Sequence, residues 1–192
     1  LTGESIQHIN IKKLENEITY GSNLIILHQD IKDIDLTYFS NLDDNRILKS
    51  GLPQWPADQL GDLGDNGALK FYREINNRLP ISTTLILNSI NYKYYKNEPS
   101  FNDRNIIFCK KGKNLKLDST KPIDLVADMT KRLQGGGSVY YSLLTLMYMG
   151  FKEIYLCGAG YTYEPMYYWH FYDIEHNIFP MSMNEEEVCS TI

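Results

Sequence analysis

The sequence predicts an α/β fold in which helices flank a mainly parallel sheet. Short apolar runs, which suit buried strands, alternate with segments of helical spacing through most of the chain. A length of 192 residues, with 43% hydrophobic and 22% charged residues, is ordinary for one globular domain with a continuous core. We therefore expect a single domain over residues 1–192, in which crossover connections join parallel strands.

The first part of the chain is expected to begin with a strand followed by a helix. Glycine, serine and asparagine interrupt the apolar residues that follow, so the second run is consistent with either strand or helix. The expected elements are a strand at 1–5 that turns at Gly3, a short helix at 11–15 capped by Asn10, a strand at 18–20, a strand or helix at 24–27, and a strand at 35–40.

The middle of the chain predicts a long loop, a helix and two strands. Prolines and glycines crowd residues 51–67, which indicates a loop that could serve as a lid. Helical spacing over 68–79 predicts a helix that Pro80 ends. The clearest strands are at 83–87 and 105–109, and the segment between them, rich in Tyr, Asn and Lys, is expected to be solvated.

The last third begins with a helix and a strand. Gly150 stops an apolar run at 139–149, and residues 153–158 are then typical of a buried parallel strand. The helix is apolar nearly all round, which predicts a central position in the fold. Its expected core residues are Val139, Leu143, Leu146 and Met147.

Composition argues against several classes of function. Lys and Arg total 19 against 24 Asp and Glu, a net charge of -5, which argues against nucleic-acid binding through a basic face. Three widely spaced cysteines argue against a disulfide framework and a zinc site. No apolar run is long enough to cross a bilayer, and no signal-peptide pattern is present. We expect a soluble cytoplasmic protein; peripheral attachment to the inner membrane and homo-oligomerisation stay open.

Three glycines at 135–137 precede Ser138 and the apolar helix. Glycines let the backbone approach a ligand closely, Ser138 can cap the exposed N–H groups, and the helix dipole favours an anion. The run matches neither the G-x-G-x-x-G fingerprint nor the Walker pattern, because no Lys follows the last glycine. A phosphate or nucleotide site and a plain hinge are both consistent with it.

A second glycine turn follows the expected strand at 153–158. Gly158 and Gly160 stand at its carboxyl end, the edge at which open parallel sheets bind ligands. Tyr161 and Tyr163 could bind a phosphate through their hydroxyls without a metal ion. The alternative is a glycine turn with surface tyrosines.

Carboxylates and one histidine are further candidates. Asp43 and Asp44 could hold a divalent ion, although a solvated turn is the commoner use of such a pair. His170, within the aromatic run 167–172, could act as a general acid or base, and packing among the aromatic rings is the alternative. No metal is expected from the remaining histidines, since none stands at metal-ligand spacing: His8, His28 and His176.

Two stretches resemble a known family. Residues 136–140 (GGSVY) and 149–158 (MGFKEIYLCG) are similar to the SG-V-Y and GYKEIYLSG segments of bacterial lipooligosaccharide sialyltransferases. They are equally similar to a related family of unknown function, which includes archaeal hydroxymethylpterin pyrophosphokinases and flagellin-modifying transferases. Residues 3–6 look like the family's GxGPSL opening, and Asn23 stands where the sialyltransferases have an asparagine that contacts the nucleotide.

The resemblance implies a single-domain, Rossmann-like glycosyltransferase fold, a variant of the glycosyltransferase-A type. It implies a nucleotide-activated donor, CMP-linked in the sialyltransferases, and a glycan acceptor in surface polysaccharide or glycoconjugate synthesis. No metal or other cofactor is required; tyrosines bind the departing phosphate and a later histidine acts as base. The implied nucleotide-binding residues are Gly3, Ser5, Asn23, Gly136, Gly137, Ser138, Tyr161 and Tyr163, and the implied base is His170.

The sequence also departs from the family pattern. Gly160 stands where the family has Asp, and Glu4 stands where it has Pro. Two alternatives therefore stay open: a Mg²⁺-dependent pyrophosphokinase acting on a pterin-like substrate, with Asp43 and Asp44 on the metal, and a non-catalytic nucleotide-binding relative. A strand end at the first residues and a helix start at 184–188 predict a piece of a longer protein, truncated at both ends.

Overall fold

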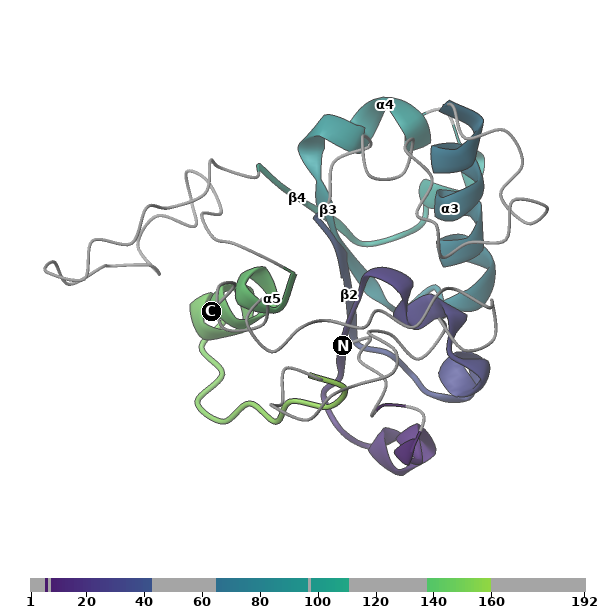
Figure 1. Ribbon diagram of the computed structural model, residues 1–192. Helices are drawn as coiled ribbons and strands as arrows, with labels where there is room; N and C mark the ends of the chain where they lie inside the picture. Colours follow the sequence, from purple (N-terminus) through teal and green to yellow (C-terminus); the bar gives the residue numbers. More distant parts are fainter. Residues whose placement is uncertain (1–5, 7, 43–64, 97, 111–137, 160–192) are drawn as a thin grey trace, which may run out of the picture.

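The sheet has four parallel strands that lie in the order of the chain. A computed structural model of the protein describes residues 6, 8–42, 65–96, 98–110 and 138–159 (Figure 1). The described strands are β1 (Tyr20–Ser22), β2 (Tyr38–Asn41), β3 (Thr84–Asn88) and β4 (Ile106–Cys109), in the order β1-β2-β3-β4. Because every pair is parallel, all four carboxyl ends lie at one edge. This confirms an α/β, Rossmann-like fold.

Helices lie on both faces of this sheet. Figure 1 shows α3 and α4 on one side of the strands and α5 on the other. We call the two sides the α3 face and the α5 face. The longer helices are α3 (Asp65–Arg78), α4 (Tyr92–Tyr95) and α5 (Ser138–Tyr148), and the short 3-10 helices are η2 (Ile11–Leu14), η3 (Asn23–Leu27), η4 (Gln29–Asp33), η5 (Ser89–Asn91) and η6 (Pro99–Phe101).

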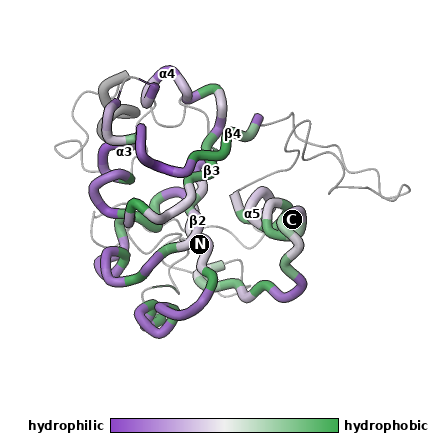
Figure 2. Tube along the Cα trace, turned by 180° about the vertical axis from the view of Figure 1, so that it is seen from behind, coloured by the Kyte–Doolittle hydropathy of each residue, from purple (hydrophilic) through white to green (hydrophobic). Residues whose placement is uncertain are grey.

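The main core lies on the α3 face. There the strands bury Phe39, Leu85 and Leu87 against side chains of α3 and of the 3-10 helices. In Figure 2 the strands β3 and β4 appear hydrophobic in the middle of the molecule, while the outer turns around them are largely hydrophilic. The fully buried residues from the covering helices include Ile26, Ile31, Phe71, Tyr72 and Ile75.

Several predicted boundaries are confirmed or adjusted. The short helix at 11–15 is η2, and its predicted cap is confirmed, since the Lys12 backbone N–H donates to Oδ1 of Asn10 at 3.2 Å. The ambiguous run at 24–27 is the helix η3, and the strand expected at 35–40 begins only at Tyr38. The helix expected at 68–79 begins earlier, at Asp65. The strand at 1–5 and most of the expected loop lie outside the described residues.

The segment between β3 and β4 is not solvated as predicted. It buries Tyr94, Tyr95 and Phe101, and Tyr95 packs edge-on against Tyr72 of α3 with ring centroids 5.2 Å apart. Tyr95 also lies 5.8 Å from Phe101, centroid to centroid. The Asn and Lys residues of this segment predicted exposure to solvent. That prediction was wrong because the aromatic rings supply enough apolar area to cover the sheet.

The face of α5 that packs on the sheet also differs from the prediction. Tyr141, Ser142, Leu144 and Thr145 are buried, whereas Met147 is 51% exposed, and Val139, Leu143 and Leu146 are only partly buried. An apolar pattern that runs all round a helix does not select a side. Contact with the sheet selects the side. Ser142 and Thr145 can be buried there because each hydroxyl donates to a carbonyl one turn earlier.

The expected buried strand at 153–158 is absent from the described part of the chain. Tyr155 is 86% exposed and Leu156 is 51% exposed. Strand formation needs a hydrogen-bonded neighbour, and none of the described strands pairs with this segment. Only Cys157, which is partly buried, packs against the main core.

Among the described residues, no helix is both long and apolar enough to cross a membrane.

Candidate functional site

The structure brings Asn23 and Ser138 together, although 115 residues separate them in sequence. The side-chain amide Nδ2 of Asn23 donates to Oγ of Ser138 at 2.6 Å. Asn23 follows the last residue of β1, and Ser138 is the first residue of α5. Both residues are half-buried. The two predicted nucleotide-binding residues inside the described part of the chain therefore form one site at the carboxyl edge of the sheet, where open α/β folds bind ligands.

A tight backbone turn holds Asn23 at this edge. Its φ of 52° lies in the left-handed region, which Asn tolerates better than most residues. Just before it, Gly21 lets η3 fold closely over β1, because a Cβ there would lie 2.9 Å from Cγ2 of Ile25 and 3.0 Å from Cδ2 of Leu36. The Gly-Ser-Asn sequence is thus the turn that presents the Asn23 amide.

The first turn of α5 supplies further polar groups beside Asn23. The first N–H groups of an α-helix have no partner within the helix, and the helix dipole gives them a partial positive charge. The Ser138 carbonyl, in contrast, is occupied, since it accepts a hydrogen bond from Oγ of Ser142 at 2.8 Å. The site therefore offers donors that carry no full charge, an arrangement suited to a phosphate or other anion.

Sequence reasoning missed two more asparagines at the same edge. Asn41 ends β2 and Asn88 ends β3, so an asparagine stands at or just after the end of three successive strands. The register pairs Ser22 with Ser40, which sets Asn23 and Asn41 at the same level. Asparagine is uncommon in strands, so its recurrence at the ends of three strands could have indicated these residues from the sequence.

Asn41 has an unsatisfied oxygen. The residue is 2% exposed, and its Oδ1 has no hydrogen-bond partner among the described residues. A buried amide oxygen of this kind is normally satisfied by an ordered water or a ligand. Because side chains alternate along a strand, Asn41 lies on the same face of the sheet as Phe39 and Leu87, the α3 face, at the end of β2.

Of the predicted second glycine turn, Gly158 lies within the described residues. Gly158 is buried with a φ of 67°, as its predicted glycine turn requires. The following lie outside the described residues: Gly3, Ser5, Asp43, Asp44, Gly136, Gly137, Gly160, Tyr161, Tyr163, His170 and His176.

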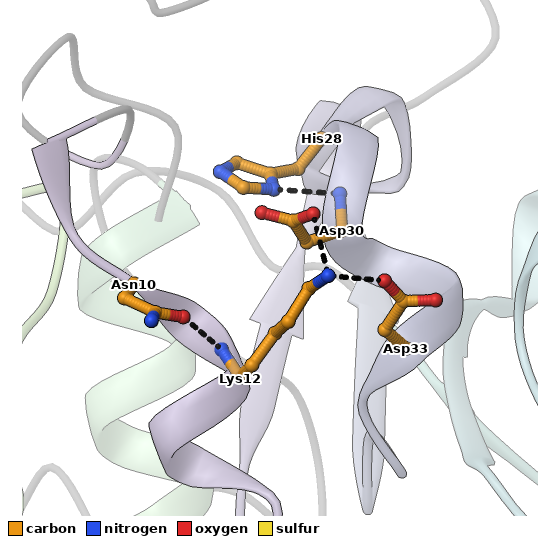
Figure 3. Close-up of polar contacts among 5 residues, drawn as sticks. All are labelled: Asn10, Lys12, His28, Asp30 and Asp33. Atoms are coloured by element: carbon orange, nitrogen blue, oxygen red, sulfur yellow. Dashed lines mark hydrogen bonds and ion pairs between the residues drawn. The ribbon is translucent and has the colours of Figure 1, made fainter.

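A second polar cluster joins η2 to η4 (Figure 3). Nζ of Lys12 lies 2.8 Å from Oδ2 of Asp33 and 3.3 Å from Oδ1 of Asp30, and these contacts, Asp33 first, raise the pKa of Lys12. The backbone N–H of Asp30 donates to Nδ1 of His28 at 3.2 Å. An open hollow of about 400 Å³ borders the cluster, lined by His8, Ile9, Asn10, Lys12 and Asp30. Because its charges already pair with one another, we assign it a structural role.

In the described ranges, no group of three or more His, Cys, Asp or Glu side chains could hold a metal ion. Comparisons with protein-family models, with curated proteins and with solved structures found no match. The class that the structure defines is therefore an α/β protein with a four-stranded, all-parallel, Rossmann-like sheet and an asparagine-rich carboxyl edge.

Proposed function

We propose that this protein is a glycosyltransferase of the sialyltransferase-like type. It transfers a sugar from a nucleotide-activated donor, CMP-linked by preference, to a glycan acceptor in surface polysaccharide or glycoconjugate synthesis. The observation that carries the proposal is the hydrogen bond between Asn23 and Ser138. Two segments chosen for their resemblance to the sialyltransferases meet at the ligand-binding edge of the fold.

The chemistry of this edge also supports a nucleotide donor. Neutral amide and hydroxyl groups beside a helix start can hold a phosphate, and they can hydrogen-bond a base or a sugar. The partial positive charge of the α5 helix start and these hydrogen-bond donors can stabilise a phosphate without a metal ion, which is compatible with a metal-independent transfer.

The proposed reaction inverts the anomeric centre. The acceptor hydroxyl attacks the anomeric carbon while the bond from that carbon to the phosphate oxygen breaks, and the hydroxyl proton passes to His170. Tyr161 or Tyr163, together with the start of α5 at Ser138, stabilises the departing phosphate. These roles for His170 and the tyrosines rest on the resemblance alone.

Calorimetric titration with CMP, CDP, UDP and ATP, each with Mg²⁺ and with EDTA, tests the proposal. We expect CMP to bind most tightly and EDTA to leave its Kd unchanged. Asn23→Gly keeps the left-handed backbone but removes the amide, so it should raise the Kd about tenfold. In the double variant, Ser138→Ala should raise the Kd by a smaller factor than it does alone, because the two side chains are in contact.

Asn10→Gly is the matched control. It removes the side chain of an asparagine that caps the 3-10 helix η2, and it should leave the Kd unchanged. Absence of binding by all four nucleotides would overturn the proposal. Tight binding of ATP only with Mg²⁺ would favour the pyrophosphokinase alternative instead.

A further inference from the structure

One buried side chain connects the ends of two neighbouring strands. Asn88, the last residue of β3, is 4% exposed. Its Nδ2 donates to the Leu42 carbonyl at 3.0 Å, and its Oδ1 accepts from the Ile90 backbone N–H at 3.2 Å. The Leu42 carbonyl lies one residue beyond the end of β2, so the sheet offers it no regular ladder partner. The Asn88 amide thus satisfies that carbonyl and fixes the backbone at Leu42.

Leu42 also belongs to the apolar cluster that includes α5. Its side chain is buried in a small cluster with Ile86 of β3 and Tyr141 of α5. Tyr141 is three residues, about one helical turn, beyond Ser138. Through this cluster, the position of Leu42 affects the turn of α5 that carries Ser138, which accepts the hydrogen bond from Asn23.

We propose that Asn88 is a positioning residue of this site: its amide fixes Leu42, and Leu42 seats the first turn of α5 so that Ser138 meets Asn23. The inference rests on the proposed function, because it assigns Asn88 to the donor site. A positioning role for Asn88 differs from a purely structural role in one measurable respect. Loss of the bridge should weaken nucleotide binding by more than the accompanying loss of stability can explain.

Two substitutions separate the bridge from the local cap. Asn88→Ser removes only the bridge, because a serine hydroxyl at this position could still accept the Ile90 N–H but is too short to reach the Leu42 carbonyl. Asn88→Ala removes both contacts. We expect both variants to raise the Kd for CMP about three- to tenfold and by similar factors, although Asn88→Ala should be the less stable.

A double-mutant cycle with Ser138→Ala tests whether Asn88 acts through Ser138. We expect Asn88→Ser to have little further effect on the Kd once the Ser138 hydroxyl is absent. Fully additive effects would overturn the inference. Arg104→Lys is the stability control, because Arg104 is buried near the end of α3 and its hydrogen bonds go to Asn76, Leu79 and Pro80. If it raises the Kd as much as Asn88→Ser at equal loss of stability, the role of Asn88 is structural only.

Hydrogen exchange in the ligand-free protein supplies a readout that needs no nucleotide. Asn88→Ser should speed amide exchange in residues 141–145 of α5 and leave exchange in η2 unchanged. Faster exchange at α5 with no nucleotide binding by the parent protein would retain the positioning effect and reject the proposed function. Unchanged exchange at α5 would overturn the inference even if CMP binds.

Discussion

The two faces of the sheet bury different kinds of side chain. The α3 face buries a large, almost entirely apolar cluster drawn from β2, β3, α3 and the 3-10 helices. The α5 face has only Leu42, Ile86 and Tyr141 at the centre of its described cluster. The strands and α5 also bury residues with hydroxyl groups: Ser22, Ser40, Ser142 and Thr145. Among the described residues, the α3 face therefore gains more hydrophobic stabilisation than the α5 face, since this stabilisation scales with the apolar area removed from water.

This division leaves the α5 face free to carry polar interactions. The bond between Asn23 and Ser138 lies there, as does the amide bridge from Asn88 to Leu42. Each polar contact is worth little beside the burial of a large apolar side chain. Substitutions on the α5 face should therefore alter the proposed site with a small loss of stability, and substitutions on the α3 face should do the reverse.

Adjacent residues of β2 give the sharpest test of this contrast. Phe39 is fully buried on the α3 face, and Ser40, the next residue, is buried on the opposite face. Phe39→Ala should cost about 3–5 kcal/mol in the free energy of unfolding, because it leaves a cavity in the main core. Ser40→Ala should cost about 1 kcal/mol or less. Urea denaturation followed by circular dichroism measures both, and equal losses would contradict the contrast.

A buried arginine is the main polar exception on the α3 face. Nη1 of Arg104 donates to the Pro80 carbonyl and Nη2 to the Leu79 carbonyl, each at 2.7 Å. Its Nε donates to Oδ1 of Asn76 at 2.6 Å. These bonds satisfy carbonyls at the end of α3, and burial lowers the pKa of the guanidinium. Arg104→Met should cost about 3 kcal/mol, because it leaves several acceptors unpaired.

The exposed Arg73 is the matched control for this prediction. It pairs with Glu98 at 2.7 Å between Nη2 and Oε1, but its side chain is 58% exposed. Surface ion pairs contribute little, since solvent screens them. Arg73→Met should therefore reduce the unfolding midpoint far less than Arg104→Met, and similar losses would show that burial does not set the difference.

Local pattern was enough to predict elements whose sequence selects one conformation. The helix that becomes α3 has regular apolar spacing and a proline just past its end, and β3 and β4 are short apolar runs. The packed side of α5 was not predictable, because apolar residues lie all round it and only contact with the sheet selects Tyr141 over Met147. The strand expected at 153–158 failed for a related reason, since a strand depends on a neighbour that its own sequence does not specify.

The candidate site divides in the same way. Asn23 and Ser138 were selected by resemblance and by helix-start chemistry, and their nucleotide-binding role stays a prediction even though they meet in space. Asn41 and Asn88 were missed, because their interest arises from parallel register and from hydrogen-bond satisfaction, which are properties of the assembled sheet. A search for polar residues at successive strand ends could have found both.

Buried tyrosines on the two faces give the smallest effect at neutral pH and a distinct dependence at high pH. Burial raises the pKa of Tyr95 strongly on the α3 face, and it raises that of Tyr20 on the α5 face less. Neither hydroxyl oxygen has a hydrogen-bond partner within the described residues. Tyr95→Phe and Tyr20→Phe should therefore change stability little at pH 7.

Above about pH 10 the two tyrosines should matter, because the unfolded chain releases their protons first. A raised native pKa means that the stability is fully present below about pH 10 and is lost as pH rises through the native value, by up to about 1.4 kcal/mol per pH unit for each group. Urea midpoints between pH 8 and about pH 11.5 should fall less steeply in Tyr95→Phe than in the parent protein, and by a smaller margin in Tyr20→Phe. Tyr155→Phe, at a side chain 86% exposed, is the matched control and should follow the parent. If the urea midpoint of Tyr95→Phe falls with pH as steeply as that of Tyr155→Phe, the aromatic cluster on the α3 face admits a phenolate. Burial at this position would then not distinguish the two faces.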